Sequence, residues 1–154
     1  MVKRYQYSYL NDIINLIYDT IDNINIKDYN IEQINAWKSG FRNKLNLNNS
    51  FERNYTVVFE QDNIIKGFGE CNYNGYLDKI YIHKNFQRKG IATILINDIE
   101  NEIKIKNKNL KKIYSFVSIT AKPFFEKMNY KVISKRCVKR NNIQICNFEM
   151  EKMI

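Results

Sequence analysis

The fold of this chain is decided by the stretch Ile80–Ile96, which reads IYIHKNFQRKGIATILI. The stretch begins as an apolar strand and turns through a basic loop. After Gly90 it predicts an amphipathic helix, because apolar residues recur at every fourth position: Ile91, Leu95, Ile99 and Ile103. The first turn of a helix carries N–H groups without intrahelical partners and a partial positive charge. A strand, a short glycine loop and a helix start therefore predict an anion-binding site.

The residues of the loop fit a pyrophosphate group. Gly90 has no side chain, so that a phosphate can approach the backbone closely, and Ala92 keeps the next approach narrow. Arg88 and Lys89 add full positive charges beside these amides. We therefore predict that the loop cradles the pyrophosphate of a ligand.

The loop Gln87-Arg88-Lys89-Gly90-Ile91-Ala92 resembles the Gln/Arg-x-x-Gly-x-Gly/Ala signature of the GNAT superfamily of acyl-CoA-dependent N-acyltransferases. That family carries the signature between its fourth strand and the following helix. The resemblance implies acetyl-CoA as the acyl donor and no metal. It implies the following contacts to the donor: Ile80, Tyr81, Ile82, Gln87, Arg88, Lys89, Gly90, Ile91, Ala92, Thr93, Ser118 and Phe125.

The rest of the chain supplies the other elements of that fold. Apolar spacing, caps and turn residues predict the order of the elements. The amino-terminal half has a strand within Met1–Tyr9, helices over Leu10–Ile24 and Asn30–Trp37, a short helix and loop over residues 41–52, and strands Tyr55–Gln61, Ile64–Tyr73 and Tyr76–His83. After the helix that follows Gly90 come strand Lys111–Val117, a short helix through Pro123, and strands Tyr130–Arg140 and Ile143–Lys152. Asn74-Gly75 is the strongest two-residue hairpin signal.

This order is similar to the GNAT fold over essentially the whole chain. We expect one domain, residues 1–154, of the α/β (α+β) class. The resemblance implies a mixed, mostly antiparallel sheet of six or seven strands with helices on both faces and splayed parallel central strands. In such a gap the pantetheine arm binds like an added strand.

The composition of the chain limits the classes of function that it can have. The chain has 44% hydrophobic and 27% charged residues, as is ordinary for a globular domain, and a net charge of +9. The charge suits a phosphate-bearing ligand or nucleic acid, although the abundance of Asn, Ile, Lys and Tyr also suggests an AT-rich coding sequence. No apolar run approaches the roughly 18 residues of a membrane span, and the amino end lacks a signal-peptide core. We expect a cytoplasmic protein without a membrane partner.

Three cysteines without CxxC spacing predict neither a disulfide framework nor a zinc site. A two-residue turn at Asn141-Asn142 places Cys137 opposite Cys146 across a hairpin. In a reducing cytosol we expect both thiols to be free.

An acceptor pocket is predicted near the second helix. Tyr29, Gln33 and Trp37 share one face, and a bacterial-type GNAT subfamily has a similar Tyr-x-x-x-Gln-x-x-Ala-Trp pattern. The same subfamily ends in Asn-x-x-Met-x-Lys, which implies Asn147 as a further pocket residue. Trp37 packing on the core is the open alternative. The aromatic side chains of this region could suit a cationic amine.

The catalytic residues are less well marked. Phe125 stands where many relatives carry the tyrosine that protonates the leaving thiolate, and a phenyl ring cannot donate a proton. Candidate bases are Glu70 and Asp78, and Tyr81 is a candidate acid. Strand alternation places Asp78 on the face opposite Lys79 and Tyr81. An ordinary surface or cross-strand role remains the alternative for both carboxylates.

These observations lead to one functional hypothesis and two alternatives. We predict that the protein moves an acetyl group from acetyl-CoA to a primary amine, of a small molecule or a peptide, by direct attack on the thioester. A domain that binds acyl-CoA without catalysis and a basic nucleic-acid-binding module stay open. No RNP, zinc-finger or helix-turn-helix pattern supports the latter. The last strand could pair with a second copy, so a homodimer also stays open.

Overall fold

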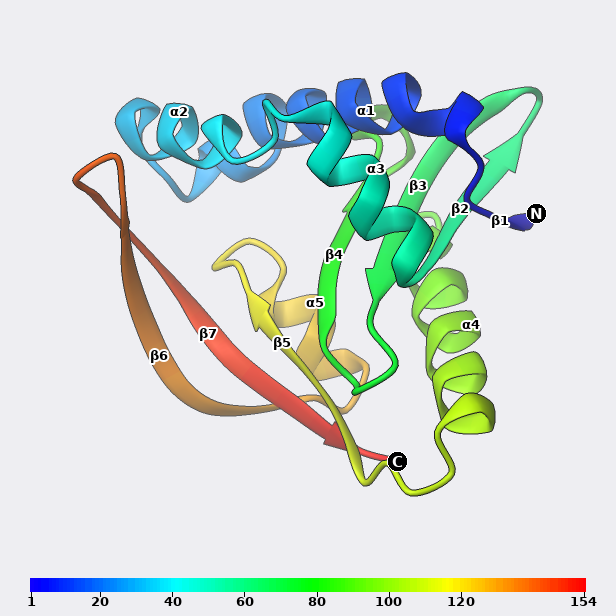
Figure 1. Cartoon of the computed structure of the whole chain (residues 1–154). Helices are drawn as coiled ribbons and strands as arrows, with labels where there is room; N and C mark the ends of the chain where they lie inside the picture. The colour runs from blue at the N-terminus through cyan, green and yellow to red at the C-terminus, as the bar shows by residue number, and fades with distance from the viewer.

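Two antiparallel sheets form the frame of the computed structural model, which describes residues 1–154 (Figure 1). The first sheet has the order β1-β2-β3-β4, and its strands are Val2–Arg4, Tyr55–Gln61, Ile64–Cys71 and Leu77–Ile82. The second has the order β5-β7-β6, with strands Lys112–Val117, Ile143–Met153 and Lys131–Arg140. The predicted seven strands are therefore divided between two sheets.

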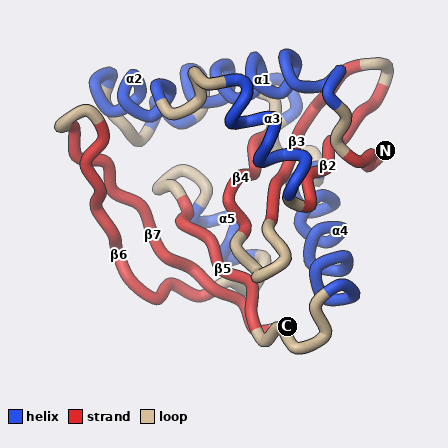
Figure 2. Tube along the Cα trace, in the orientation of Figure 1, coloured by secondary structure: helices blue, strands red, loops and turns tan.

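Helices cover both faces of this frame (Figure 2). Helices α1 (Leu10–Asn23), α2 (Ile31–Ser39) and α3 (Lys44–Arg53) enclose one hydrophobic core, and α4 (Ile91–Lys106) and α5 (Lys122–Lys127) enclose another. The apolar stripe predicted for α4 is buried at all four positions, Ile91, Leu95, Ile99 and Ile103, and Ile96 is buried as well. The fold class predicted from the sequence is confirmed. None of these helices combines the length and apolar character needed to span a membrane.

The two sheets meet along a seam between β4 and β5, which run parallel. A single parallel bridge joins Tyr76 and Tyr114, where the Tyr114 N–H donates to the Gly75 carbonyl at 2.9 Å. The Ser115 hydroxyl adds a bond to the Leu77 carbonyl at 2.6 Å. Beyond these contacts the two strands no longer pair, so the splayed arrangement implied by the family resemblance is present.

Two hairpins have the turns that their sequences predict. Asp62 and Asn63 have φ of 55° and 60°, and Asn141 and Asn142 have φ of 52° and 63°, as a two-residue hairpin turn requires. The Asn74-Gly75 turn differs, because only Gly75 has a positive φ, of 90°. The Asn72 side chain accepts from the N–H groups of Asn74 and Tyr76, which closes a longer loop.

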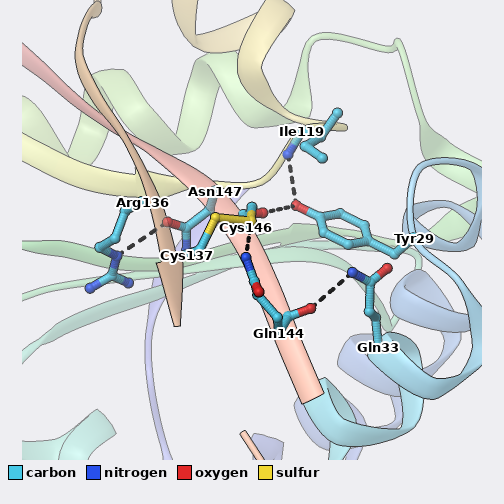
Figure 3. Close-up of a disulfide and its surroundings, with 8 residues drawn as sticks. All are labelled: Tyr29, Gln33, Ile119, Arg136, Cys137, Gln144, Cys146 and Asn147. Atoms are coloured by element: carbon cyan, nitrogen blue, oxygen red, sulfur yellow. Dashed lines mark hydrogen bonds between the residues drawn. A yellow bond between two sulfur atoms is a disulfide. The ribbon is translucent and has the colours of Figure 1, made fainter. Parts of the chain in front are cut away.

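The structure corrects two expectations. The first strand ends at Arg4, because Tyr7–Tyr9 form a turn of 3₁₀ helix that leads into α1. Cys137 and Cys146 are joined in a disulfide, so the expectation of free thiols is wrong (Figure 3). The predicted register does place them opposite each other, and directly opposed side chains of an antiparallel pair are close together. The expectation rested on the cellular compartment, whereas the pairing follows from the register.

Candidate active site

A cavity of about 860 Å³ occupies the seam between β4 and β5, and we call it the seam cavity. The start of α4 and the segment around α5 complete its walls. Every residue predicted to contact the acyl donor lines this cavity, except Lys89, which is exposed beside it. The structure thus brings together residues that lie up to 45 positions apart, from Ile80 to Phe125.

Strand β4 presents main-chain groups to the seam cavity. The His83 N–H donates to the Lys66 carbonyl on β3 at 2.9 Å. Hydrogen-bonded pairs recur at every second residue of an antiparallel ladder, so the N–H and C=O of Tyr81 also point to β3. Those of Ile80 and Ile82 point the other way, toward the seam. Tyr81 can therefore contribute to this cavity through its side chain and not through its main chain.

The loop after β4 is anchored at one carbonyl. The Ile82 oxygen accepts from the Thr20 hydroxyl at 2.9 Å and from the Gln87 side-chain amide at 2.6 Å. Gln87 thereby fixes the start of the loop, and α1 is tied to the same point. The main-chain groups left to bind a ligand in the seam are the N–H and C=O of Ile80 and the N–H of Ile82.

The loop itself forms a cluster of free donors. Arg88 and Gly90 have φ of 58° and 80°, which turns the backbone sharply into α4. Ile94 is the first residue of the helix whose N–H finds a carbonyl, that of Gly90, at 3.1 Å. The N–H groups from Arg88 to Thr93 donate to no group of the chain. A Cβ added at Gly90 would meet no atom within 4 Å, so the glycine faces open space.

A second cavity, of about 420 Å³, lies between the helical face and the β6–β7 hairpin, and we call it the hairpin cavity. The two cavities share a wall of six residues: Trp37, Asp78, Lys79, Tyr81, Phe116 and Ser118. Tyr29 and Asn147 line the hairpin cavity as well. Gln33 lies outside both cavities. Its amide donates to the Gln144 carbonyl (Figure 3), and its side-chain oxygen accepts from the Asn30 N–H.

Tyr81 belongs to the shared wall. Its hydroxyl oxygen accepts a hydrogen bond from the indole N–H of Trp37 at 3.2 Å. Its ring is stacked on Phe68, with 5.9 Å between centroids. Burial raises the pKa of Tyr81, so its hydroxyl keeps its proton throughout the neutral range.

Tyr29 is a structural residue of the hairpin cavity. Its hydroxyl donates to the Cys146 carbonyl on β7 and accepts from the Ile119 N–H, both at 2.9 Å (Figure 3). It thus joins β7 to the loop that follows β5. Its ring meets Trp37 edge to face, with centroids 5.2 Å apart. Tyr29 therefore holds the shared wall in place.

The two candidate bases have different surroundings. Glu70 is fully buried and accepts from Ser50, from Asn54 at 2.7 Å and from the Lys79 ammonium at 2.7 Å. These bonds occupy its carboxylate, and neither cavity reaches it. Asp78 lines both cavities, its side chain is 40% exposed, and it pairs with Lys79 at 2.6 Å.

A bulge explains the position of Asp78. Glu70 lies opposite Lys79 and Cys71 lies opposite Leu77, so Asp78 has no partner on β3. The regular alternation of side chains is interrupted there. Asp78 consequently reaches the same ammonium as Glu70, and the expectation that Asp78 and Lys79 point to opposite faces is wrong.

Phe125 lies on the seam cavity with its ring almost completely buried against Phe124 and Tyr130. It supplies an apolar surface and no proton. Thr120, on the same cavity, has a buried hydroxyl without a hydrogen-bond partner in the chain. Ser118 accepts from the Ala121 N–H at 3.0 Å and so starts the turn into α5.

The hairpin cavity also has residues that our sequence reasoning missed. Phe116 of the shared wall, and Arg136, Val138 and Arg140 of β6, were not singled out. The three β6 residues alternate along one face of a strand whose register was predicted, which was the available signal. No group of three or more His, Cys, Asp or Glu side chains is placed to hold a metal ion.

Comparison with known proteins agrees with this geometry. The family model of the acetyltransferase (GNAT) domain matches residues 25–152. Three solved structures share the fold. The first is a GCN5-related N-acetyltransferase from Rhodopseudomonas palustris, described as an aminotransferase of class II. The second is PaiA N-acetyltransferase from Thermoplasma acidophilum in complex with coenzyme A. The third is YncA from Salmonella typhimurium with acetyl-CoA.

Their similarity to this chain lies in structure far more than in sequence. The first has a TM-score of 0.94 at 19% identity and covers 100% of this chain and 95% of its own. The second has a TM-score of 0.79 at 19% identity and covers 100% of this chain and 98% of its own. The third has a TM-score of 0.73 at 10% identity and covers 99% of this chain and 92% of its own. Among curated proteins no match to the sequence was found. With the family model covering most of its length, this chain belongs to the GNAT acetyltransferase family.

Proposed function

We propose that this protein transfers an acetyl group from acetyl-CoA to a primary amine, which attacks the thioester directly. The observation that carries the proposal is the shared wall, where the seam cavity and the hairpin cavity meet at Tyr81 and Asp78. One cavity holds the donor, the other holds the acceptor, and the reacting atoms meet at the wall. Two of the similar structures contain coenzyme A or acetyl-CoA, which supports this use of the fold.

The residues of the seam cavity fit acetyl-CoA. The free N–H groups from Arg88 to Thr93 and the Arg88 side chain suit the pyrophosphate, and the open space at Gly90 admits it. The free main-chain groups of Ile80 and Ile82 suit the amides of the pantetheine arm. The buried Thr120 hydroxyl is one further polar group on the same surface. When bound, acetyl-CoA supplies the activated carbonyl carbon.

The groups at the shared wall suit the chemistry. An amine is cationic at neutral pH and must lose a proton before it attacks, and the partly exposed Asp78 carboxylate is placed to accept that proton directly or through a water molecule. The Ile80 N–H, which points to the seam, can donate to the carbonyl oxygen as negative charge develops there. Glu70 holds Lys79 and, through it, Asp78 in position.

Tyr81 takes the role of the acid. Phe125 occupies the position of the usual tyrosine, whereas the Tyr81 hydroxyl lies on the shared wall, accepts from Trp37 and is free to donate. A thiolate leaving group is itself fairly stable, because a thiol has a pKa of about 8.5. Tyr81 therefore needs to assist the departure of the thiolate only modestly.

Calorimetric titration with acetyl-CoA, coenzyme A and ATP tests the proposal. We expect micromolar binding of the first two and much weaker binding of ATP, which lacks the pantetheine arm. Gly90→Trp should abolish binding, whereas Lys104→Trp, at an exposed position of α4 outside the cavity, should leave it intact. Release of coenzyme A in the presence of an amine panel then separates an enzyme from a domain that only binds acyl-CoA. Full affinity in the Gly90→Trp protein would refute the cradle.

A further inference from the structure

Two arginines of β6 face the hairpin cavity without a carboxylate partner. Arg136 and Arg140 line this cavity together with Asp78 and Lys79, and neither arginine takes part in an ion pair. Lys79, by contrast, is bound by two carboxylates. The cavity therefore carries two guanidinium groups that form no ion pair within the chain.

Arg136 is held in a fixed position. Its guanidinium lies 3.5 Å from the centre of the Phe116 ring, and its Nε donates to the Asn147 side-chain oxygen at 3.2 Å (Figure 3). Those two contacts leave its terminal nitrogens free to donate. They also cover the face of Phe116, so this aromatic ring is not open to a cationic amine.

The guanidinium of Arg140 lies against Gly40, which also lines the hairpin cavity. A Cβ added at Gly40 would lie 2.1 Å from an Nη of Arg140. Gly40 has φ of −68° and ψ of −12°, a conformation that any residue adopts, so its backbone does not require glycine. The space that the missing side chain leaves is occupied by the guanidinium. The missing side chain of Gly40 thus leaves room for the Arg140 guanidinium at the end of α2.

We infer that the acceptor is an amine whose molecule also carries an anionic group, a carboxylate or a phosphate, which Arg136 and Arg140 bind. The inference rests on the proposed function and names the substrate class of the same site. Planar guanidinium groups bind such oxyanions in a bidentate manner. Asp78 belongs to the shared wall and the two arginines belong to β6, so we place the amine end of the acceptor at Asp78 and its anionic end at the arginines.

The test compares acceptors that differ only in the anion. β-Alanine is paired with β-alaninamide, and phosphoethanolamine with ethanolamine. Binding to the protein saturated with coenzyme A is measured by calorimetry, and turnover by release of coenzyme A from acetyl-CoA. We expect the anionic member of at least one pair to be favoured by roughly ten- to hundred-fold, as for hydrogen bonds to charged groups. The pair that shows the preference distinguishes a carboxylate from a phosphate.

Matched variants assign the effect to the two arginines. Arg136→Gln and Arg140→Gln should remove the preference, while Lys135→Gln and Lys139→Gln, which remove the same charge from the outer face of β6, should keep it. Gly40→Ala should weaken the anionic acceptors as Arg140→Gln does, although no charge is lost.

Three outcomes would overturn the inference: equal binding of both members of each pair, no binding of any member, or arginine variants that weaken neutral and anionic amines alike. Failure of the proposed function looks different. In that case the anionic amines bind and depend on the arginines, yet no amine releases coenzyme A.

Discussion

The indole N–H of Trp37 donates a hydrogen bond to the Tyr81 hydroxyl oxygen across 3.2 Å, and both side chains line both cavities. The bond fixes the direction in which Tyr81 can donate. Because the Tyr81 oxygen accepts from Trp37, its own proton is free to point toward a ligand at the shared wall. The pair thus links the position of α2 to the reaction that we propose at the shared wall.

Replacing Tyr81 by Phe should therefore slow the reaction without weakening the donor. We expect kcat to fall by roughly 10²-fold, as for the loss of a general acid, and the Kd of acetyl-CoA to stay nearly constant. The Trp37 N–H loses its partner, which should lower the free energy of unfolding by about 1 kcal/mol. Steady-state kinetics, calorimetry and urea denaturation measure the three quantities. Tyr18→Phe, which removes a hydroxyl outside both cavities, is the control.

Glu70→Gln should act on stability and not on the proton transfer. The change leaves the Lys79 ammonium, whose side chain is 13% exposed, with only Asp78 as its partner. We expect the free energy of unfolding to fall by about 3 kcal/mol, because a buried charge loses one of its two counter-charges. The dependence of kcat on pH should stay the same in the folded fraction. A fully stable variant that loses the acidic limb of this dependence would make Glu70, and not Asp78, the base.

Reduction of the disulfide should destabilise the β6–β7 hairpin, which carries Arg136 and Arg140. Cys137 and Cys146 are nine residues apart, and closing a loop of this size stabilises a folded state by about 2 to 3 kcal/mol. The Cys137→Ser/Cys146→Ser protein should unfold at a lower urea concentration than the oxidised protein, and a reductant should affect only the latter. Thiol titration of the denatured, unreduced protein should find Cys71 alone. Three reactive thiols would show that the bridge does not form.

Stability should decline above about pH 10. Burial raises the pKa of Tyr5 to about 12 from its ordinary value of 10.0, and it also raises the pKa of five other tyrosines: Tyr29, Tyr55, Tyr76, Tyr81 and Tyr130. These phenols keep their protons in the folded state at a pH where the unfolded chain loses them, so the stabilisation is complete below pH 10 and is lost above it.

Urea denaturation from about pH 8 to about pH 11 measures this decline. Tyr130→Phe should flatten the alkaline slope, because the pKa of Tyr130 is raised by burial and by the nearby Glu100. Tyr73→Phe, at an exposed position, should leave the slope unchanged. If stability declined with the same alkaline slope in both variants, the contribution assigned to Tyr130 would be contradicted.

Local patterns predicted much of the fold. Asn30 and Gln33 do form the capping box that starts α2, and the turn at Asn141-Asn142 does set the register that opposes Cys137 and Cys146. Each of these features depends on residues that are neighbours in the chain or across one turn. Periodicity and turn chemistry are sufficient in such cases.

Features that depend on distant packing were not predictable. The burial of Glu70 requires α3 to bring Ser50 and Asn54 over β3, and no local pattern encodes that contact. The bulge at Asp78 is a single extra residue in a strand that alternates regularly otherwise. Arg136 and Arg140 belong to the site only because the β6–β7 hairpin lies opposite the helical face across the hairpin cavity.

The seam between β4 and β5 has a thermodynamic consequence. It closes at the Tyr76–Tyr114 bridge and opens beyond it, so each sheet ends there in an edge strand with unpaired main-chain groups. A ligand that hydrogen-bonds in the seam acts as a missing strand and joins the two sheets into one. The free energy of binding this ligand then also stabilises the folded state against unfolding. At a donor concentration of 100 Kd the folded state gains about 2.7 kcal/mol, so the melting temperature of the protein would report how much of its own donor is present.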